Sequence, residues 1–238
     1  YIGMGRLEAG RVEQIVAGVA AGCRANGCAL LGGETAEMPD FYAPGEYDLA
    51  GFIVGVVEED HRPGQHRVRP GDRLIGLASN GFHTNGYSLL RRLLFDRLGL
   101  GPDDPFPGGG GSVADVLLRI HRSYLEPVGR MLDAGLIHAL AHITGGGIPE
   151  NLVRVLPPGL EAHVDTAAWT PPAEFLAIQE LGPVPRDEMF RTFNVVVGMI
   201  LVVPPQAVDE AAGIARAAGV DAWVLGDVRE GAGGVVLH

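Results

Sequence analysis

The apolar positions of the first sixty residues predict one helix followed by two strands. In residues 7–26 apolar side chains recur every three or four positions, which is typical of an amphipathic helix, and Gly27 is a common helix end. The short apolar run at 28–31 predicts a buried strand, and the longer run at 49–57 predicts a second one. Between them, proline and glycine in residues 38–47 indicate a loop.

The composition changes at residues 61–70, where proline, glycine, glutamine and arginine replace the apolar pattern. Such a stretch is the best candidate for a linker between two domains. Beyond it, strands and helices alternate, and Pro127 stands where it would break or restart a helix. Because there is no internal repeat, we expect an α+β (mixed α/β) fold. The expected strands are 73–78, 136–144, 193–203 and 223–228, and the expected helices are 87–98, 113–134, 148–155 and 206–218.

Glycine and arginine are the unusual components of the chain. The 238 residues include 36 glycines, roughly twice the usual share of about 7%, and all 18 basic residues are arginine. Without lysine, this chain contains neither a Schiff-base lysine nor a Gly-Lys-Ser/Thr phosphate loop. The hydrophobic content of 47% excludes a disordered chain.

The net charge, the apolar runs and the number of cysteines exclude several classes of partner and of structural site. A net charge of -11 argues against a surface for nucleic acid or for an anionic membrane. The longest apolar run, residues 195–203, is far below the roughly 20 residues that a membrane-spanning helix needs. Two cysteines, Cys23 and Cys28, are too few for a zinc or disulfide framework, so we expect reduced thiols in a cytoplasmic protein.

Two glycine-rich loops, 79–86 and 144–151, follow predicted buried strands and open into predicted helices. Glycines allow backbone N–H groups to converge, and a helix N-terminus adds partial positive charge, so either loop could hold phosphate without a basic side chain. The alternative is an ordinary tight turn with Asn and Ser caps. Hydroxyl and amide groups that could share phosphate oxygens are carried by Ser79, Asn80, Thr84, Asn85 and Thr144.

A third junction, residues 32–39, places a carboxylate directly after a predicted strand. Glu34 could hold Mg²⁺ against nucleotide phosphates, with Thr35 as a hydroxyl neighbour, because Mg²⁺ needs only one or two carboxylates besides phosphate and water. From spacing alone, a surface glutamate in a turn is the more common outcome.

Of the eight histidines, His83 is the one that lies among glycine and polar residues in a loop of the ligand-binding type. It could act as a general acid or donate a hydrogen bond to substrate. His138 and His142 lie four residues apart and share one face of a predicted strand, where packing is the more common role than ligand binding.

Five ordered motifs carry a family resemblance over essentially the whole chain. The motifs are Gly-Gly-Glu-Thr-Ala-Glu-Met-Pro at 32–39, Tyr-Asp-Leu-Ala-Gly-Phe at 47–52, Gly-Phe-His-Thr-Asn-Gly-Tyr-Ser-Leu at 81–89, His-Ile-Thr-Gly-Gly-Gly-Ile-Pro-Glu-Asn at 142–151 and Met-Phe-Arg-Thr-Phe-Asn at 189–194. With these motifs in this order, the chain resembles phosphoribosylformylglycinamidine cyclo-ligase, also called aminoimidazole ribonucleotide synthetase, more fully than it resembles the other enzymes that share that fold.

The resemblance implies an ATP- and Mg²⁺-dependent ring closure in purine biosynthesis, with formylglycinamidine ribonucleotide as the substrate. ATP would phosphorylate the formyl oxygen, and attack by a nitrogen of the same molecule would close the ring and release phosphate and ADP. The resemblance further implies a nucleotide and metal site at Gly33, Glu34 and Thr35, and contacts to substrate or to the transferring phosphate from Ser79, Asn80, Gly81, His83 and Asn85. The ribose phosphate would bind at Thr144, Gly145, Gly146, Gly147 and Asn151.

The sequence departs from the family at Asn80 and Thr84, where serine is usual, and in length. Family members carry roughly a hundred further N-terminal residues, about the size of a small domain, with a lysine thought to serve ATP. We therefore expect residues 1–62 to be the second half of an ATP-binding, dimer-forming domain, 63–70 a linker, and 71–238 an intact carboxy-terminal domain. A chain of this extent should not turn over at the family's rate, whereas the full-length homodimer should.

Two alternatives remain at this stage. The chain could transfer phosphate to another small acceptor, as thiamine-monophosphate kinase or selenophosphate synthase of the same fold does. It could also be a non-catalytic module for dimerisation and phosphate binding. The sequence leaves open which glycine-rich loop holds ATP and which holds substrate, since both ligands carry phosphates.

Overall fold

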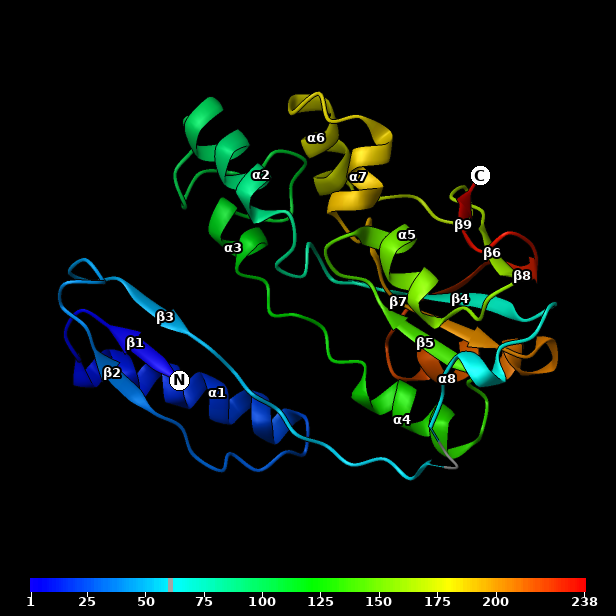
Figure 1. The fold of residues 1–238 in the computed structure, drawn as a ribbon. Helices are drawn as coiled ribbons and strands as arrows, with labels where there is room; N and C mark the ends of the chain where they lie inside the picture. Colours follow the sequence, from blue (N-terminus) through cyan, green and yellow to red (C-terminus); the bar gives the residue numbers. More distant parts are fainter. Residues whose placement is uncertain (60–61) are drawn as a thin grey trace. The chain divides into compact units, whose positions relative to one another are not determined.

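The computed structural model describes residues 1–59 and 62–238, which divide into two compact units, Tyr1–Glu58 and Glu59–His238 (Figure 1). Residues 60–61, at the end of the segment that we assign to the first domain, lie outside the described residues. The segment for which we expect a linker belongs to the second unit, where η2 (Gln65–Arg67) forms and Val68 is buried.

The first unit is a three-stranded sheet with one long helix. β1 (Ile2–Met4) lies between β2 (Thr35–Glu37), which is parallel to it, and β3 (Tyr47–Leu49), which is antiparallel. The helix α1 (Ala9–Ala25) connects β1 to β2, as a crossover between parallel strands requires. Ile2 and Met4 are buried, whereas α1 has no buried residue within the described chain.

The two strands predicted in this unit, at 28–31 and 49–57, are not formed as expected. Residues 28–31 are not a strand, and the strand begins only at Thr35; residues 50–58 are extended chain without regular pairing. The pairing of β3 with β1 runs out where Ala50 meets Tyr1, so the apolar residues beyond it have no neighbouring strand among the described residues to bond to. Phe52 and Val56 are accordingly 98% and 97% exposed.

The second unit is built on a six-stranded sheet in the order β5-β7-β4-β8-β6-β9. All neighbouring strands are antiparallel except β6 and β9, which are parallel. The strands are β4 (Arg73–Ala78), β5 (Ala139–His142), β6 (Leu160–Val164), β7 (Val197–Val203), β8 (Ala222–Glu230) and β9 (Gly234–Leu237). The mixed α/β architecture that we expect from the sequence is confirmed, although β6 and β9 were not among the expected strands.

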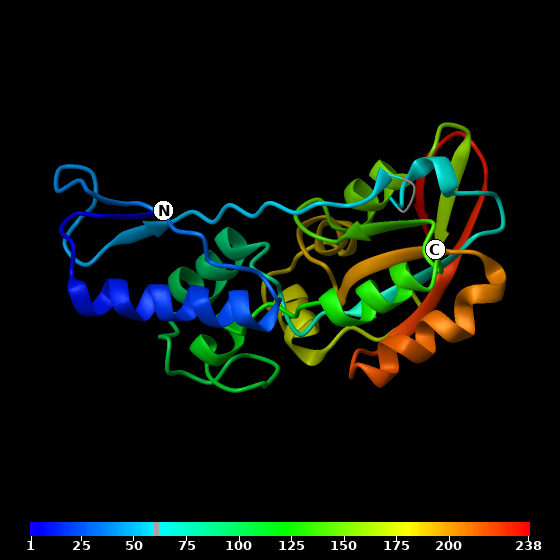
Figure 2. The same ribbon diagram turned by 90° about the horizontal axis from the view of Figure 1, so that it is seen from below.

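Helices cover both faces of this sheet (Figures 1 and 2). Helices α4 (Leu125–Asp133) and α8 (Val208–Ala217) pack on one face, and successive residues of β4 alternate between the two cores, with Leu74 in the larger and Ile75 in the smaller. Because both faces are buried, β4 and β7 are continuous apolar runs. The other helices of this unit contribute to the larger core: α2 (Tyr87–Arg91) with η3 (Arg92–Arg97), α3 (Val113–Leu117), α5 (Gly147–Leu152) with η4 (Val153–Val155), α6 (Ala173–Leu181) and α7 (Arg186–Thr192). A short helix, η5 (Pro205–Ala207), leads into α8.

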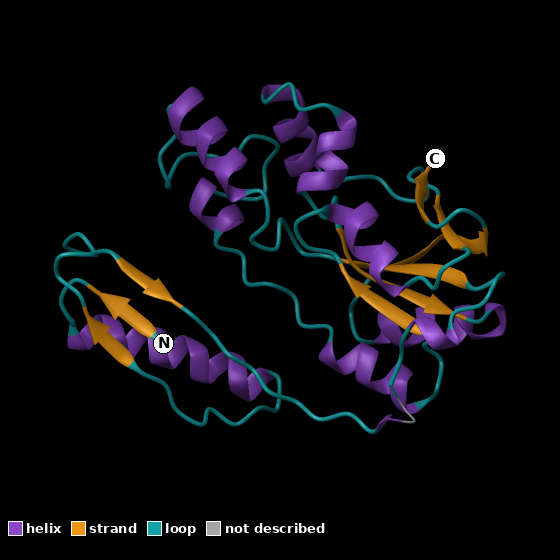
Figure 3. Cartoon of the chain, viewed as in Figure 1, coloured by secondary structure: helices purple, strands orange, loops and turns teal. Residues whose placement is uncertain are grey.

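The helix expected over 113–134 is two helices separated by an irregular segment, which Figure 3 draws as a loop between α3 and α4. α3 begins with a capping box between Ser112 and Asp115 and ends at Leu117. Pro127 is the third residue of α4, a position in the first turn where the missing N–H costs nothing. None of the helices in the described ranges combines the length and apolar character needed to cross a bilayer.

Candidate functional site

The loop 79–86 follows β4 directly, and the hydrogen bonds of its first residue, Ser79, anchor it to the protein interior. The register of β4 with β7 shifts between Leu77 and Ala78, just where the strand gives way to the loop. The Ser79 N–H donates to the carbonyl of Val196 at 2.7 Å, and its hydroxyl lies 2.9 Å from the carbonyl of Gly81. Ser79 is buried, so its polar atoms anchor the loop rather than face solvent.

Asn194 is the residue that locks this loop to the strand β7. It is fully buried, and its Oδ1 accepts hydrogen bonds from the Val196 N–H at 2.8 Å and the Ser79 hydroxyl at 3.1 Å. Its Nδ2 donates to the carbonyl of Gly81 at 2.9 Å. Asn194 closes the last of the five motifs, although it was not among the expected site residues.

Four non-glycine residues beside the loop adopt left-handed backbone conformations. His83 and Thr84 have φ of 50° and 60°, and Val195 and Val196 have φ of 45° and 69°. This region is unfavourable for a β-branched residue, and such strain persists only where the surroundings hold it. Asn194 holds Val196, and the Trp169 indole N–H donates to the carbonyl of Val195 at 2.8 Å.

His83 is buried beneath the exposed ring of His121. The two rings stack with centroids 3.6 Å apart, and the Nε2 of His83 lies 2.7 Å from the Oδ1 of Asn80. If this nitrogen carries the proton and donates it to Asn80, the Nδ1 of His83 has a free lone pair. That Nδ1 is buried and has no hydrogen-bond partner among the described residues.

Burial, followed by the charges of His121, His142 and Arg122, lowers the pKa of His83 from 6.5 to about 3. Burial likewise lowers the pKa of His142. His83 is therefore a neutral imidazole at neutral pH, which can share a hydrogen bond through either ring nitrogen but carries no additional proton to donate as an acid.

The low pKa of His83 should make the second unit less stable as the pH falls below about 6.5. The unfolded chain takes up a proton on this ring near its ordinary pKa of 6.5, while the folded chain does not until about pH 3. The stabilisation is complete above 6.5 and is lost on acidification, at up to about 1.4 kcal/mol per pH unit for one proton. Urea unfolding between pH 7 and 4.5 should show this slope, and His83→Asn, which tolerates a positive φ, should reduce it. Thr192→Ala, which removes a surface hydrogen bond and no titratable group, is the control and should leave the slope unchanged.

The second loop, 144–147, is shaped by two glycines with positive φ. Gly146 has φ of 92° and Gly147 has φ of 59°. A Cβ on Gly147 would overlap the carbonyl oxygen of Phe190 in α7, so this position has room for glycine alone. The Gly147 N–H donates to the carbonyl of Thr144 at 2.9 Å and is engaged within the loop.

The side chain of Asn151 in α5 forms hydrogen bonds to several residues of this loop. It is buried, and its Nδ2 lies 2.8 Å from the carbonyl of Gly147 and 3.2 Å from that of Gly145. Its Oδ1 accepts from the Thr144 hydroxyl at 3.3 Å. Because these atoms are used inside the protein, the geometry suits Asn151 to positioning the loop rather than to contacting a ligand.

Asn85 joins the two glycine-rich loops. Its Oδ1 accepts a hydrogen bond from the Gly145 N–H at 2.9 Å, and its Nδ2 donates to the carbonyl of His83 at 3.0 Å. One amide side chain thus bridges segments sixty residues apart in sequence. The structure brings Ser79, Asn80, Gly81, His83 and Asn85 together with the loop 144–147 at one end of the sheet.

A pocket of about 270 Å³ opens beside the first loop, lined by Ser79, Asn80 and Gly81. Arg119 closes one side of it, donating to the carbonyl of Asn80 at 2.9 Å and lying 3.5 Å from the carboxylate of Glu174. Neither Arg119 nor Glu174 was expected from the sequence, because neither belongs to a glycine-rich junction.

The third junction lies in the first unit. Gly33 and Glu34 are exposed and precede β2, which Thr35 opens, and the Glu34 carbonyl accepts from the Ile2 N–H at 2.9 Å. The exposed carboxylate of Glu34 fits a hard cation such as Mg²⁺ by its chemistry. Among the described residues, the one group of at least three close metal-ligating side chains is elsewhere, at His83, His121 and His142.

The sheet with helices on both faces and its two linked glycine-rich loops place the chain in the AIR synthase-related class. Residues 69–238 match the family model "AIR synthase related protein, C-terminal domain", and residues 1–57 match "AIR synthase related protein, N-terminal domain". The chain is 50% identical to the phosphoribosylformylglycinamidine cyclo-ligase of Anaeromyxobacter sp., covering 98% of this chain and 67% of that protein. It is 47% identical to the same enzyme from Trichlorobacter lovleyi, covering 96% of this chain and 66% of that one. The chain belongs to the phosphoribosylformylglycinamidine cyclo-ligase family, whose named members are enzymes of the ligase class.

Solved structures of lower identity share the fold. Thiamine-monophosphate kinase from Stenotrophomonas maltophilia superposes with a TM-score of 0.66 at 16% identity, covering 99% of this chain and 70% of that one. A hydrogenase maturation protein HypE in complex with ATP gives 0.64 at 19% identity, covering 99% of this chain and 68% of that one. The chain spans about two thirds of the length of the curated relatives that it matches.

Proposed function

We propose that this chain takes part in the ATP-dependent cyclisation of formylglycinamidine ribonucleotide to aminoimidazole ribonucleotide in purine biosynthesis. The name of the curated relatives supports this reaction. The single observation that supports assigning the substrate site to the two glycine-rich loops is the hydrogen bond from the Gly145 N–H to Asn85, which joins them. The reaction has to hold two phosphate-bearing molecules and align one oxygen with a phosphoryl group, which is a task of positioning.

Each of the two loops is assigned a different part of the substrate. We assign the ribose phosphate to Gly145, Gly146 and Gly147, with Thr144 and Asn151 holding the loop in shape. Ser79, Asn80 and Gly81 line the pocket of about 270 Å³ where the reacting part of the substrate would lie. The Asn85 bridge fixes the spacing between the two, which sets where the formyl oxygen sits relative to the phosphate anchor.

His83 is assigned to the reacting end as a neutral imidazole. Closing the ring requires the attacking nitrogen to lose a proton, while the phosphorylated oxygen leaves with its phosphate. That proton can pass to the departing phosphate or to water, and a neutral ring with one free nitrogen can accept a hydrogen bond from the attacking nitrogen before it leaves. The Asn80 contact on the other ring nitrogen would keep the imidazole oriented during this step.

ATP and Mg²⁺ are assigned to the first unit. Mg²⁺, when bound, would neutralise phosphate charge on the nucleotide, and the exposed Glu34, with Gly33 and Thr35 beside it, offers the carboxylate that it prefers. The fold relative HypE was solved in complex with ATP, which supports a nucleotide site in this fold. We also assign a cytoplasmic homodimer, with the unburied apolar residues of α1 as part of the contact.

Ligand binding by this chain tests the proposal. We expect formylglycinamidine ribonucleotide to bind in calorimetry and thiamine monophosphate not to bind. Asn85→Leu should weaken substrate binding by about tenfold or more, since it removes the hydrogen bond that orders the second loop. Thr192→Ala, which removes a surface hydrogen bond to Glu188, is the matched control and should leave binding unchanged. Preference for thiamine monophosphate would instead support phosphotransfer to another acceptor, and equal binding by both variants would remove Asn85 from the site.

A further inference from the structure

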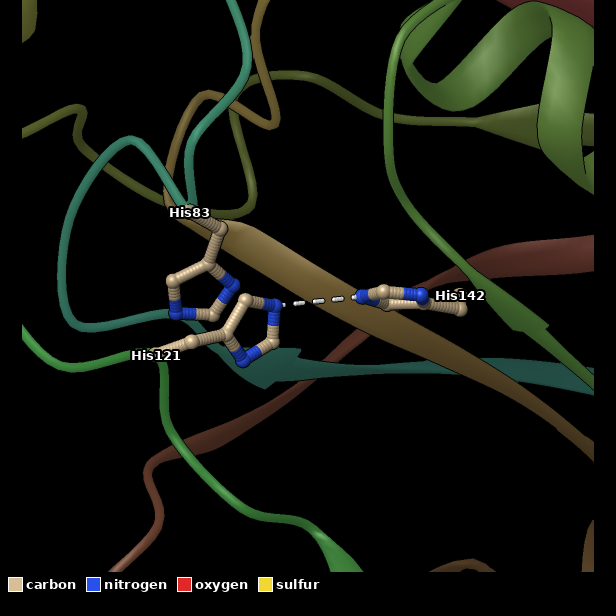
Figure 4. A group of neighbouring side chains, drawn as sticks. All are labelled: His83, His121 and His142. Carbon is tan, nitrogen blue, oxygen red and sulfur yellow. Dashed lines mark hydrogen bonds between the residues drawn. The ribbon is translucent and has the colours of Figure 1, made fainter. Parts of the chain in front are cut away.

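Three histidines from three separate segments converge at the edge of the proposed site. His83 lies in the loop after β4, His121 in the irregular segment between α3 and α4, and His142 at the end of β5. One ring nitrogen from each lies within 4.8 Å of the other two. Figure 4 shows the ring of His121 between those of His83 and His142, with the His121–His142 contact dashed.

The ring nitrogens that face away from the cluster are already fixed by carbonyl-type oxygens. The Nδ1 of His121 lies 2.8 Å from the carbonyl of Arg122, and the Nε2 of His83 lies 2.7 Å from the Oδ1 of Asn80. The Asn80 N–H also points at the Nε2 of His83, at 3.3 Å, but the shorter contact to Oδ1, an oxygen that can only accept, places the proton on this nitrogen. A proton on each of the two outward nitrogens leaves the lone pair of the other one, the Nε2 of His121 and the Nδ1 of His83, free. This is the arrangement in which metal-binding histidines are usually held.

The spacing within the cluster also suits an ion. The Nε2 atoms of His121 and His142 are 3.3 Å apart, which is long for a hydrogen bond but matches the roughly 3.3 Å between two nitrogens on one tetrahedral Zn²⁺ at about 2.0–2.1 Å each. The third nitrogen is the buried, unpartnered Nδ1 of His83, which in Figure 4 lies on the side of its ring nearer His142. The lone pair of this nitrogen lies in the plane of the His83 ring, so the ring of His121, which is stacked on the face of His83, does not lie in its direction.

We propose that His83, His121 and His142 form a binding site for one divalent transition ion of the Zn²⁺ type. Three imidazoles with an open fourth position are a known zinc ligand set, and nitrogen ligands favour such ions over Mg²⁺. Two of the ligands are exposed, so the fourth position faces solvent and the ion can exchange.

The ion would take up the free nitrogen of His83, so a loaded site and the substrate contact proposed for that ring exclude one another. Binding of the ion itself does not depend on the cyclo-ligase function. A chain that binds Zn²⁺ at these rings and ignores formylglycinamidine ribonucleotide would support this site and contradict the proposed function, and the reverse result would do the opposite.

Calorimetry with Zn²⁺ tests the site in a Cys23→Ser/Cys28→Ser background, which removes the two free thiols as competing ligands. We expect one ion per chain, and at least about 100-fold weaker binding in His121→Ala, because losing a ligand costs no less than losing a group that orients one. His121 is exposed, so this variant should keep its urea midpoint. His66→Ala and His238→Ala are the histidine controls and should not change the affinity. The second of these removes half of the His163–His238 pair, where Nδ1 and Nε2 are 2.9 Å apart.

A crystal soaked in Zn²⁺ provides the direct check. The anomalous map should show one peak about 2.0–2.1 Å from a nitrogen of each of the three rings. Unchanged Zn²⁺ affinity in His121→Ala, loss of binding in His238→Ala, or a peak away from these rings would overturn the proposal.

Discussion

Gly147→Ala should lower the free energy of unfolding of the second unit by about 2–5 kcal/mol. Two costs add at this residue. A φ of 59° places alanine in the left-handed region, at about 1–2 kcal/mol, and its Cβ would overlap the backbone carbonyl of Phe190, which can yield only if α7 moves, at about 1–3 kcal/mol. Urea unfolding should show the midpoint fall without a change in slope.

Gly135→Ala separates these two costs. Gly135 has a similar φ of 68°, but a Cβ there would meet no atom within 4 Å. It should therefore lose only the part that comes from the backbone conformation, about 1–2 kcal/mol. The same two variants also test the proposed substrate site. Gly147→Ala should displace the loop 144–147 and weaken substrate binding, whereas Gly135→Ala should not. Equal loss of stability in the two variants would show that the Phe190 carbonyl does not restrict this position.

Asn194→Leu should lower the free energy of unfolding by about 2–5 kcal/mol, although leucine is similar in size. The change leaves the half-buried Val196 N–H without its partner, at about 1–3 kcal/mol, and removes one of the two hydrogen bonds to the Gly81 carbonyl, which the Ser79 hydroxyl still bonds, at about 0.5–1.5 kcal/mol. The left-handed backbone at Val196 also loses the contact that holds it. Chemical denaturation measures the loss.

A double-mutant cycle between Ser79→Ala and Asn194→Ala tests whether the two residues act together. Their direct hydrogen bond at 3.1 Å should give a coupling energy of about 0.5–3 kcal/mol. The surface variant Thr192→Ala should change stability by no more than about 0.5 kcal/mol. Strict additivity of the two buried changes would mean that Asn194 stabilises β7 without anchoring the loop.

The fold of the second unit could be predicted from the sequence where burial is two-sided and strong. β4 and β7 are continuous apolar runs because helices cover both of their faces, and that signal is local. The strands β6 and β9 were missed because they are short and half-buried. The strand predicted at 49–57 failed for the opposite reason, because an apolar run becomes a strand only where another strand supplies hydrogen-bond partners.

The candidate site also has a part that could be predicted from the sequence and a part that could not. The glycine-rich loops are visible in the sequence, since positive φ and close packing leave a compositional mark at Gly146 and Gly147. Asn194 belongs to the motif at 189–194, but its contacts to the first loop appear only in the folded chain. Arg119 and His121 could not be found, because each reaches the loops across the fold from a segment without such a mark. For His121 and His142, the sequence shows two unrelated histidines, and only the folded chain places them 3.3 Å apart.

The Asn85 bridge makes the two loops thermodynamically linked. A ligand that orders the loop 79–86 also presents Asn85 to the Gly145 N–H, so part of the entropy cost of ordering the loop 144–147 has been met before the second ligand arrives. Linkage then requires reciprocity: whatever factor the first ligand contributes to the affinity of the second, the second returns to the first. A substrate long enough to touch both loops would gain this factor within a single molecule, whereas inorganic phosphate, which reaches one loop only, would not.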